Sequence, residues 1–525
     1  MKEFFIKNKR LWIDIIVMVS VFLFVFLSYF IFKPLYFRSD VGFGSTDGVV
    51  PRIYVFTLIL IIIIVGTILR IKNKLTIEVA LFLIFLIGVI MQLNYMLITP
   101  FNYRQHDVFS YNDAGHQGYA WTLYTTGKLP TQVDSNGYLD YQFYHPPFNA
   151  FMQSTFMHIC KPFMSLYNVM TGSSYYDVTS KDSLFQTSEI LSCYYMNVAT
   201  FFAIRIAYKL KIDNKFKVMG GLFIALFPAL MILAGQENND PLCIMNCFIV
   251  IYYTICWWEN KSYYNAIMIG LFGGFAMFAK LSGALILLPA VIAYIFSIIQ
   301  AIIKKEKFYH YFIQGVIIAV LVLPIGLWFH IYAKINFNQP FGFVFANLNH
   351  DLYTGDHNFF ERFINIFDFG DMTTALWGNT FVNYNVPNFL IKSALFGEYS
   401  FICADALGAL ALIFNYLFVY LSLILMVIYF IVSKKENLEV KIIAGTLVLS
   451  QLLAQLYFNI KMPYGCTMDF RYIVPIILGF MILDVLAFDK FFKEEKSWRK
   501  YYSLALMIIG GLFLTSISLF YLTAI

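Results

Sequence analysis

The chain is poor in charged residues. Only 13% of its 525 residues are Asp, Glu, Lys or Arg, whereas 60% are hydrophobic. Because soluble domains carry about 25% charged residues, this composition excludes a soluble globular protein and predicts a polytopic protein embedded in a lipid bilayer. The formal net charge of +6 does not indicate nucleic-acid binding, because the basic residues flank apolar runs, where they set membrane orientation.

The cysteines lack any pairing pattern. The chain contains seven of them, and no two form a Cys-x-x-Cys motif. None has a histidine at metal-ligand spacing. The sequence therefore gives no sign of a disulfide framework or a zinc site, and small apolar packing is the simplest role for these side chains.

Ionisable residues are nearly absent from the centres of the apolar runs. Asp14, Glu78, Asp405 and Asp484 all lie near run ends. Ion-coupled transporters usually place ionisable groups or broken helices at the membrane midplane. This absence counts against a transporter.

Long apolar runs dominate what is present. About 20 apolar residues span a bilayer core, and this length predicts about thirteen membrane-spanning helices. They are residues 11–32, 53–70, 76–98, 188–209, 216–234, 241–258, 263–280, 281–303, 309–332, 404–432, 441–460, 472–488 and 501–523. The first run lacks a small-residue cleavage site, so we expect a retained signal-anchor helix. The predicted fold is an all-α polytopic membrane protein.

Two long polar segments, 99–187 and 333–403, interrupt the runs. Within them, residues 148–169, 359–369 and 386–395 suit interfacial helices that lie on the membrane. The apolar stretch 263–303 is too long for one pass, and the sequence AKLSG at 279–283 marks the expected break.

The distribution of lysine and arginine predicts the orientation. Alternate connections are dense in positive charge, as in KEFFIKNKR, RIKNK and SKKENLEVK, and such connections face the cytoplasm. The amino terminus is then inside. The segments 99–187 and 333–403 and the turn at 235–240 face the opposite side, so the polar side chains gather on the outer face.

The loop at 101–150 holds the strongest candidate for catalysis. Asp107 follows the third run, beside Arg104 and His106, among many aromatic residues. Partial burial raises the pKa of a carboxylate and a neighbouring cation lowers it. Such a group suits a general base that accepts a proton from an attacking hydroxyl. A helix cap or an ion pair with Arg104 is the structural alternative.

Two histidines in this loop are candidate substrate contacts. His116 lies in an expected short helix that Gly127 ends, and His145 precedes a Pro-Pro pair that fixes the backbone. Each suits contact with a substrate phosphate or hydroxyl, or with the loop itself. The sequence leaves both roles open.

A short turn supplies a second pair of carboxylates, Glu237 and Asp240. Asp240 precedes Pro241 and suits a helix start, although it also remains a candidate substrate contact. Glu237 has no such role and is the second candidate catalytic acid. A carboxylate cluster beside an anionic substrate leaves room for a divalent cation, Mg²⁺ or Mn²⁺, but no ligand spacing is diagnostic.

Two cations complete the candidate site. Lys280 lies at the expected break, and Arg471 lies at the outer end of the twelfth run. At headgroup depth both suit a lipid-linked phosphate, which the planar fork of arginine binds through paired hydrogen bonds. Snorkelling to lipid headgroups is the alternative for each.

Several of these segments, in their order along the chain, resemble motifs of the C-type (GT-C) membrane glycosyltransferases. They are RQHDV, GHQGYAWTLYTTGKLP, YQFYHPPF, GQENNDP, AKLSG and DFRYIVP. The resemblance is to the glycosyltransferase family 39 group, akin to the protein mannosyltransferases and aminoarabinose transferases. It implies inverting transfer of a sugar from a polyprenyl-phosphate donor to a glycan, lipid or protein acceptor. By this resemblance Asp107 matches the loop base and Arg471 a position near the lipid phosphate.

The resemblance also divides the chain. Residues 1–75 hold two spans ahead of a GT-C-like catalytic core at 76–332, which includes the outer loop 99–187. A second outer loop at 333–403 and C-terminal spans at 404–525 follow. The protein mannosyltransferases show an Asp-Glu pair where this chain has His106-Asp107-Val108. This difference counts against a protein acceptor and against a loop site with two carboxylates.

Other functions stay open at this point. They are a polysaccharide polymerase or ligase with a lipid-diphosphate donor, and a lipid or saccharide transporter. Richness in Lys, Ile, Asn, Phe and Tyr is typical of an AT-rich bacterial genome, so the expected location is a bacterial cytoplasmic membrane.

Overall fold

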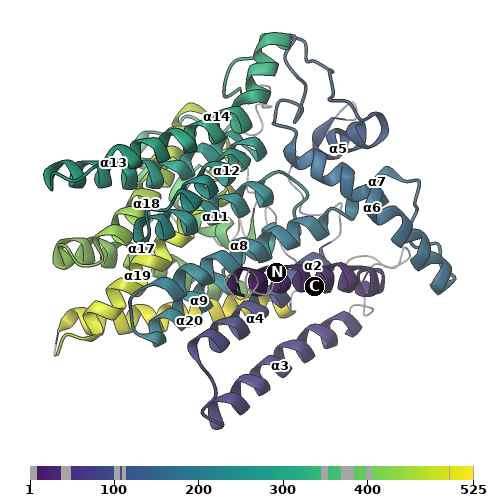
Figure 1. The fold of residues 1–525 in the computed structure, drawn as a ribbon. Coiled ribbons are helices and arrows are strands. Elements are labelled where there is room, and N and C mark those ends of the chain that lie inside the picture. The colour runs from purple at the N-terminus through teal and green to yellow at the C-terminus, as the bar shows by residue number, and fades with distance from the viewer. Residues whose placement is uncertain are drawn as a thin grey trace.

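The computed structural model describes residues 9–36, 49–99, 107–108, 114–343, 353–367, 384–397, 405–495 and 497–523. Within these ranges the protein is all-α, and the only β-structure is two isolated bridges. Most of the long helices lie side by side in a bundle (Figure 1). The expected all-α architecture is confirmed.

The helices of the first half are α2 (Lys9–Tyr36), α3 (Val49–Ile71), α4 (Ile77–Ile98), α5 (Gly115–Thr126), α6 (Phe148–Thr171), α7 (Lys181–Gln186), α8 (Glu189–Lys209), α9 (Asn214–Ala225), α10 (Pro228–Leu233) and α11 (Asp240–Glu259). Those of the second half are α12 (Tyr263–Ala279), η3 (Leu281–Ile286), α13 (Leu287–Ile303), α14 (Tyr309–Phe337), α15 (Phe359–Phe363), α16 (Val386–Phe396), α17 (Asp405–Ser433), α18 (Leu438–Lys461), η6 (Gly465–Met468), η7 (Phe470–Ile473), α19 (Ile476–Phe492) and α20 (Trp498–Thr523).

Fewer helices qualify as membrane spans than the apolar runs predict. Among the described residues ten are long and apolar enough, or eleven if η6 to α19, bent by 53°, counts as one span. The run 216–234 is not one helix, because Pro228 lacks an N–H and separates α9 from α10. The run 263–280 forms α12, whose 17 residues fall short of a full crossing.

The break expected near 279–283 is present. Helix α12 ends at Ala279, Lys280 is extended, and η3 starts at Leu281. Gly283 is required there, because a Cβ at this position would lie 2.5 Å from the carbonyl oxygen of Ala276. The close return of the chain over the end of α12 fixes where Lys280 projects.

Helices α5, α6 and α7 gather beyond one end of the bundle (Figure 1). Helix α6 covers the predicted interfacial segment 148–169, and it carries exposed apolar side chains such as Phe151, Ile159 and Leu166. Helices α15 and α16 form within the other two predicted segments. That these helices rest on a membrane surface stays a prediction.

A buried ion pair ties three helices together at the same end. Lys33 on α2 and Glu189 on α8 lie 2.5 Å apart, and both side chains are fully buried. The Lys33 ammonium also donates to the carbonyl oxygens of Met96 and Thr99, each at 2.6 Å, at the end of α4. Pairing and three acceptors offset the high desolvation penalty of two buried charges.

One acidic residue lies differently from the prediction. Asp484 was expected near a span end, but it is buried midway along α19, where it accepts a hydrogen bond from Ser422 at 2.5 Å. The prediction was wrong because the helix extends beyond the apolar run to Phe492. The lack of ionisable groups in the middle of the spans is therefore weaker evidence against a transporter than the sequence indicated.

Candidate functional site

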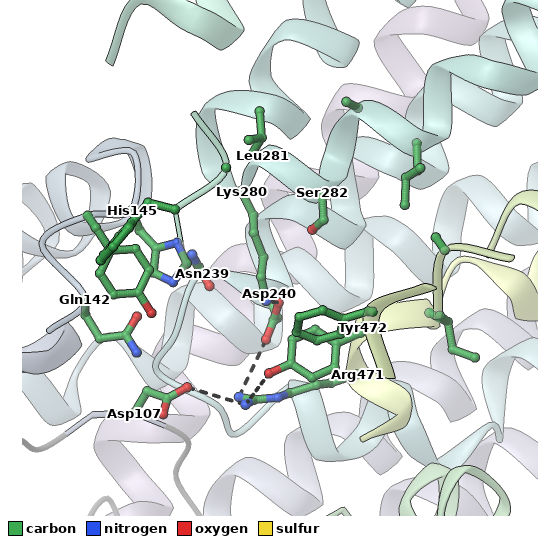
Figure 2. A pocket seen from close by; sticks show the side chains of 18 of the residues that line it. Asp107, Gln142, His145, Asn239, Asp240, Lys280, Leu281, Ser282, Arg471 and Tyr472 are labelled. Carbon is green, nitrogen blue, oxygen red and sulfur yellow. Dashed lines mark hydrogen bonds and ion pairs between the residues drawn. The ribbon is translucent and has the colours of Figure 1, made fainter. Parts of the chain in front are cut away.

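A cavity of about 450 Å³ lies where the helix ends meet the loop segment before α6 (Figure 2). Six of the predicted site residues line it, namely Asp107, His116, His145, Asp240, Lys280 and Arg471. They come from positions up to 364 residues apart in the sequence. The fold therefore brings together side chains that the sequence only placed on one side of the membrane.

Asp107 is held by its backbone as well as its carboxylate. Its φ of +58° lies in the left-handed region, which Asp tolerates better than most residues. Its carbonyl oxygen accepts the N–H of His116 at the start of α5. The Tyr141 hydroxyl donates to Oδ1 at 2.5 Å. With the carboxylate 34% exposed, Asp107 is both oriented and reachable.

Arg471 lies near the carboxylates of Asp107 and Asp240 in the cavity (Figure 2), and Asp469 is a third carboxylate beside it. Its guanidinium is 3.4 Å from Asp107 Oδ2, 3.8 Å from Asp240 Oδ2 and 3.8 Å from Asp469 Oδ2. It also donates to the Tyr472 hydroxyl at 3.0 Å. These distances are long for charge-assisted hydrogen bonds, which are usually about 2.7–2.9 Å, so the guanidinium is shared loosely.

Asp240 joins the two cations. Its Oδ1 lies 2.5 Å from the Lys280 ammonium, while Oδ2 faces Arg471. Asp240 is the first residue of α11, and the N-cap position belongs to Asn239. The sequence position of Asp240 suggested a helix cap, but Asp240 does not cap the helix. Its carboxylate binds Lys280 across the break after α12.

The ring of Tyr472 makes a cation–π contact with each of the two cations. The Lys280 ammonium lies 4.7 Å and the Arg471 guanidinium 5.0 Å from its ring centroid. Three carboxylates, on Asp107, Asp240 and Asp469, and these two cations give the site a formal charge of −1. The aromatic face stabilises the cations where they would otherwise repel each other.

The two histidines are neutral components of the wall. Their rings stack with centroids 6.1 Å apart. Burial lowers the pKa of His116 to about 4, against the opposing effect of Asp107. Burial lowers the pKa of His145 well below its usual value, and His116 lowers it further. Near neutral pH these side chains therefore act as hydrogen-bonding groups and not as cations.

The phenol of Tyr141 stays protonated. Burial raises its pKa, and the neighbouring Asp107 carboxylate raises it further. A proton held on this oxygen is what allows Tyr141 to donate to Asp107. The contact therefore fixes one carboxylate oxygen and leaves the other toward Arg471.

Glu237 lies outside this cavity. It is fully buried in the turn before α11, and it does not line the cavity. Burial and the neighbouring Glu189 raise its pKa, while Lys33 lowers it. Its main-chain carbonyl accepts from Gln153 at 3.0 Å. The turn thus directs Glu237 into the bundle and Asp240 toward the cavity. Arg104 and His106 lie outside the described residues.

Sequence reasoning missed two residues that position charge, Tyr141 and Tyr472. Both are single tyrosines in a chain with 37 of them, so nothing in composition or spacing distinguishes them. Tyr472 directly follows Arg471, and that adjacency was the one available signal.

No metal-ligand cluster is present in the described part of the chain. No group of three or more His, Cys, Asp or Glu side chains is arranged there to hold a metal ion. The carboxylates of the cavity face Arg471 or Lys280 instead. The requirement for Mg²⁺ or Mn²⁺ stays an untested prediction.

Comparison with known proteins adds no assignment. No protein-family model matches the chain, and no curated protein matches it.

Proposed function

We propose that this protein is an inverting membrane glycosyltransferase of the GT-C kind, which transfers a sugar from a polyprenyl-phosphate donor to a hydroxyl acceptor. One observation carries the proposal: a reachable carboxylate, Asp107, faces a buried guanidinium, Arg471, at 3.4 Å in the wall of a cavity of about 450 Å³. A base beside a phosphate-binding cation is the minimal equipment for this displacement.

The surroundings of the cavity suit a lipid-linked substrate. A second cavity of about 280 Å³ shares Ile473 with the first, and it is walled by apolar side chains such as Phe223, Phe418 and Leu390. A phosphate beside Arg471 would then have its prenyl chain against apolar walls and its sugar in the polar cavity. The adjacency of a polar and an apolar cavity favours a lipid-phosphate donor over a water-soluble one.

The proposed reaction is a direct displacement. Asp107 accepts the proton of the acceptor hydroxyl as its oxygen attacks the anomeric carbon. The bond between that carbon and the phosphate oxygen breaks, and the prenyl phosphate departs with the bonding electrons. Lys280 and Arg471 stabilise the charge that develops on the departing phosphate. Attack from the face opposite the leaving group inverts the anomeric configuration.

The loose contact between Asp107 and Arg471 gives this mechanism an order. A donor phosphate forms shorter, paired hydrogen bonds with a guanidinium than a carboxylate at 3.4 Å does. Donor binding would therefore draw Arg471 away from Asp107, and the base would gain proton affinity as it loses its cation. The site is then competent only when the donor is in place.

Substitution of Asp107 by Asn tests the base. Asn tolerates the left-handed backbone at this position, so folding and membrane expression should be preserved. Sugar transfer, followed by mass spectrometry of cell-envelope glycans and prenyl-linked sugars, should fall by about 10²–10⁴-fold. Asp177→Asn, which alters an exposed carboxylate in the same outer segment bonded to Thr179, is the matched control. If the Asp107→Asn variant retains sugar transfer, Asp107 is not the general base.

The thirteen spans and the outward orientation belong to this proposal. Ten or eleven helices satisfy the length criterion in the described residues, and α9 with α10 and the short α12 would supply further crossings. A cysteine-labelling scan of the connections would place each on one side of the membrane. If the cysteine of an Asp177→Cys variant is labelled from the cytoplasmic side, the proposed orientation is wrong.

The alternatives make different predictions for the same variants. A polymerase or ligase would release prenyl diphosphate, which phosphate analysis of the spent lipid distinguishes from monophosphate. A transporter would show vesicle flux that survives Asp107→Asn. Arg471→Ala should weaken donor use markedly, and unchanged donor affinity and turnover would assign Arg471 to lipid headgroups instead.

A further inference from the structure

A third cavity, of about 600 Å³, lies between α2, α4, α8 and α11. Its wall contains four charged residues, Asp14, Glu78, Arg205 and Lys209. None of them belongs to the site described above. A cavity of this size is large enough to hold a small-molecule ligand.

This cavity lies at the end of the bundle opposite the candidate site. Asp14 belongs to the second turn of α2, Glu78 to the first turn of α4, and Arg205 to the last turn but one of α8. At their other ends these three helices meet through Lys33 and Glu189. The 22 residues of α4 rise about 33 Å, close to the roughly 30 Å of a bilayer core. In a bilayer that these helices span, the cavity would lie at the interface opposite the candidate site.

The charges around the cavity are balanced and partly exposed. Arg205 Nη1 lies 3.1 Å from Asp14 Oδ1, with side chains 30% and 26% exposed. The Tyr208 hydroxyl donates to Glu78 Oε1 at 2.8 Å. The wall carries two carboxylates and two cations. Arg205 pairs with Asp14 within the wall, whereas Lys209 pairs with Glu259, outside the wall, at 2.6 Å. A ligand carrying both signs matches this wall better than an anion does.

The remaining wall is apolar and reaches the lipid-facing surface. Phe85 is 1% exposed at the inner side, whereas Phe82 is 42% exposed and Ile13 is 48% exposed. A hydrocarbon chain entering past Phe82 would lie against Phe85 while its polar head remained near Arg205. A free phosphate or amine would leave this apolar wall uncovered.

We propose that this cavity binds a phospholipid with a zwitterionic, primary-amine headgroup, of the phosphatidylethanolamine class. The phosphate pairs with Arg205 and Lys209, and arginine suits it because of its planar donors. The ammonium donates to Glu78 and Asp14. An anionic phosphatidylglycerol would bring a net negative charge to a wall with two carboxylates. A phosphatidylcholine has the same charges but no N–H donor.

The test uses the full protein reconstituted in vesicles with equal parts of phosphatidylethanolamine, phosphatidylcholine and phosphatidylglycerol. After mild extraction, native mass spectrometry counts the retained lipids. We expect phosphatidylethanolamine to exceed phosphatidylcholine roughly fivefold, the effect of about one net hydrogen bond. Preferential retention of phosphatidylglycerol, equal retention of all three, or no retained lipid would each overturn the proposal.

Two variants locate the binding in this cavity. Glu78→Gln should reduce the preference for phosphatidylethanolamine over phosphatidylcholine, and Arg205→Gln should reduce retention of all three lipids. Glu436→Gln is the control, because Glu436 is exposed in the α17–α18 turn, where it pairs with Lys490. A preference in the unaltered protein that Glu78→Gln leaves intact would place the lipid elsewhere. Melting temperatures confirm that each variant is folded.

Discussion

Asp240 is the carboxylate whose removal the structure predicts most sharply. Its side chain is 5% exposed, and it lies 2.5 Å from Lys280 and 3.8 Å from Arg471. Asp240→Asn keeps the size of the side chain and removes its charge. Breaking a buried ion pair costs about 3–5 kcal/mol. Because Lys280 is 14% exposed and Arg471 keeps Asp107 and Asp469, we expect a destabilisation of about 2–3 kcal/mol.

The same substitution should improve anion binding. It changes the formal charge of the site from −1 to zero, since Asp107 and Asp469 then balance the two cations. A prenyl monophosphate would be repelled less, because one carboxylate charge is gone. Lys280 and Arg471 would also each have one fewer carboxylate partner. We expect its affinity to rise roughly threefold to tenfold. Loss of stability together with a gain in ligand affinity is the signature of this charge arrangement.

Two measurements check these expectations. Denaturant unfolding in detergent gives the stability change, and titration with a prenyl monophosphate gives the affinity. Glu436→Gln is again the matched control, because its carboxylate is 58% exposed and 2.7 Å from Lys490, so it should lose less than about 1 kcal/mol. Equal destabilisation by both variants would refute the buried pair. Unchanged or weaker phosphate binding by Asp240→Asn would refute the phosphate role of the cations.

Three further predictions follow from single contacts. Tyr141→Phe removes the donor that orients the candidate base, so kcat/KM should fall roughly tenfold with little change in donor affinity, and steady-state kinetics with Tyr138→Phe as control decide it. Gly283→Ala should destabilise by more than about 2 kcal/mol, because its Cβ would lie 2.5 Å from a backbone oxygen of α12. Gly315→Ala, with open space around it, should be neutral or slightly stabilising, and a melting comparison that ranks them equally would contradict the close approach. Because burial lowers the pKa of His116 to about 4, stability should fall by up to about 1.4 kcal/mol per pH unit from pH 6.5 toward 4. Melts at several pH values should show that His116→Gln reduces this slope.

The sequence predicted the helices well, because apolar length determines whether a segment crosses a bilayer. The break at Lys280 was also predictable, since glycine and lysine in an apolar stretch signal an interruption. Pro228 was equally visible, but the hydropathy of 216–234 outweighed it. The extent of α19 was not predictable, because Asp484 and Asp489 are buried there by neighbouring helices.

The site was only partly predictable. Positive-charge bias placed Asp107, Asp240 and Arg471 on one side, and the fold brings them into one cavity. Bias of this kind cannot tell which way a turn points. Glu237 and Asp240 are three residues apart, yet only Asp240 reaches the cavity. That choice depends on packing against residues far away in the chain.

The ion pair between Lys33 and Glu189 has a consequence for biosynthesis. The two residues are 156 positions apart, so at 5–20 residues per second the ribosome needs about 8–30 s to make the partner of Lys33. A lysine without its carboxylate is expensive within hydrocarbon. We expect α2 to stay near the membrane surface, where the Lys33 ammonium reaches water, until α8 is inserted. The first of the described helices to be synthesised would then be among the last to take its final place.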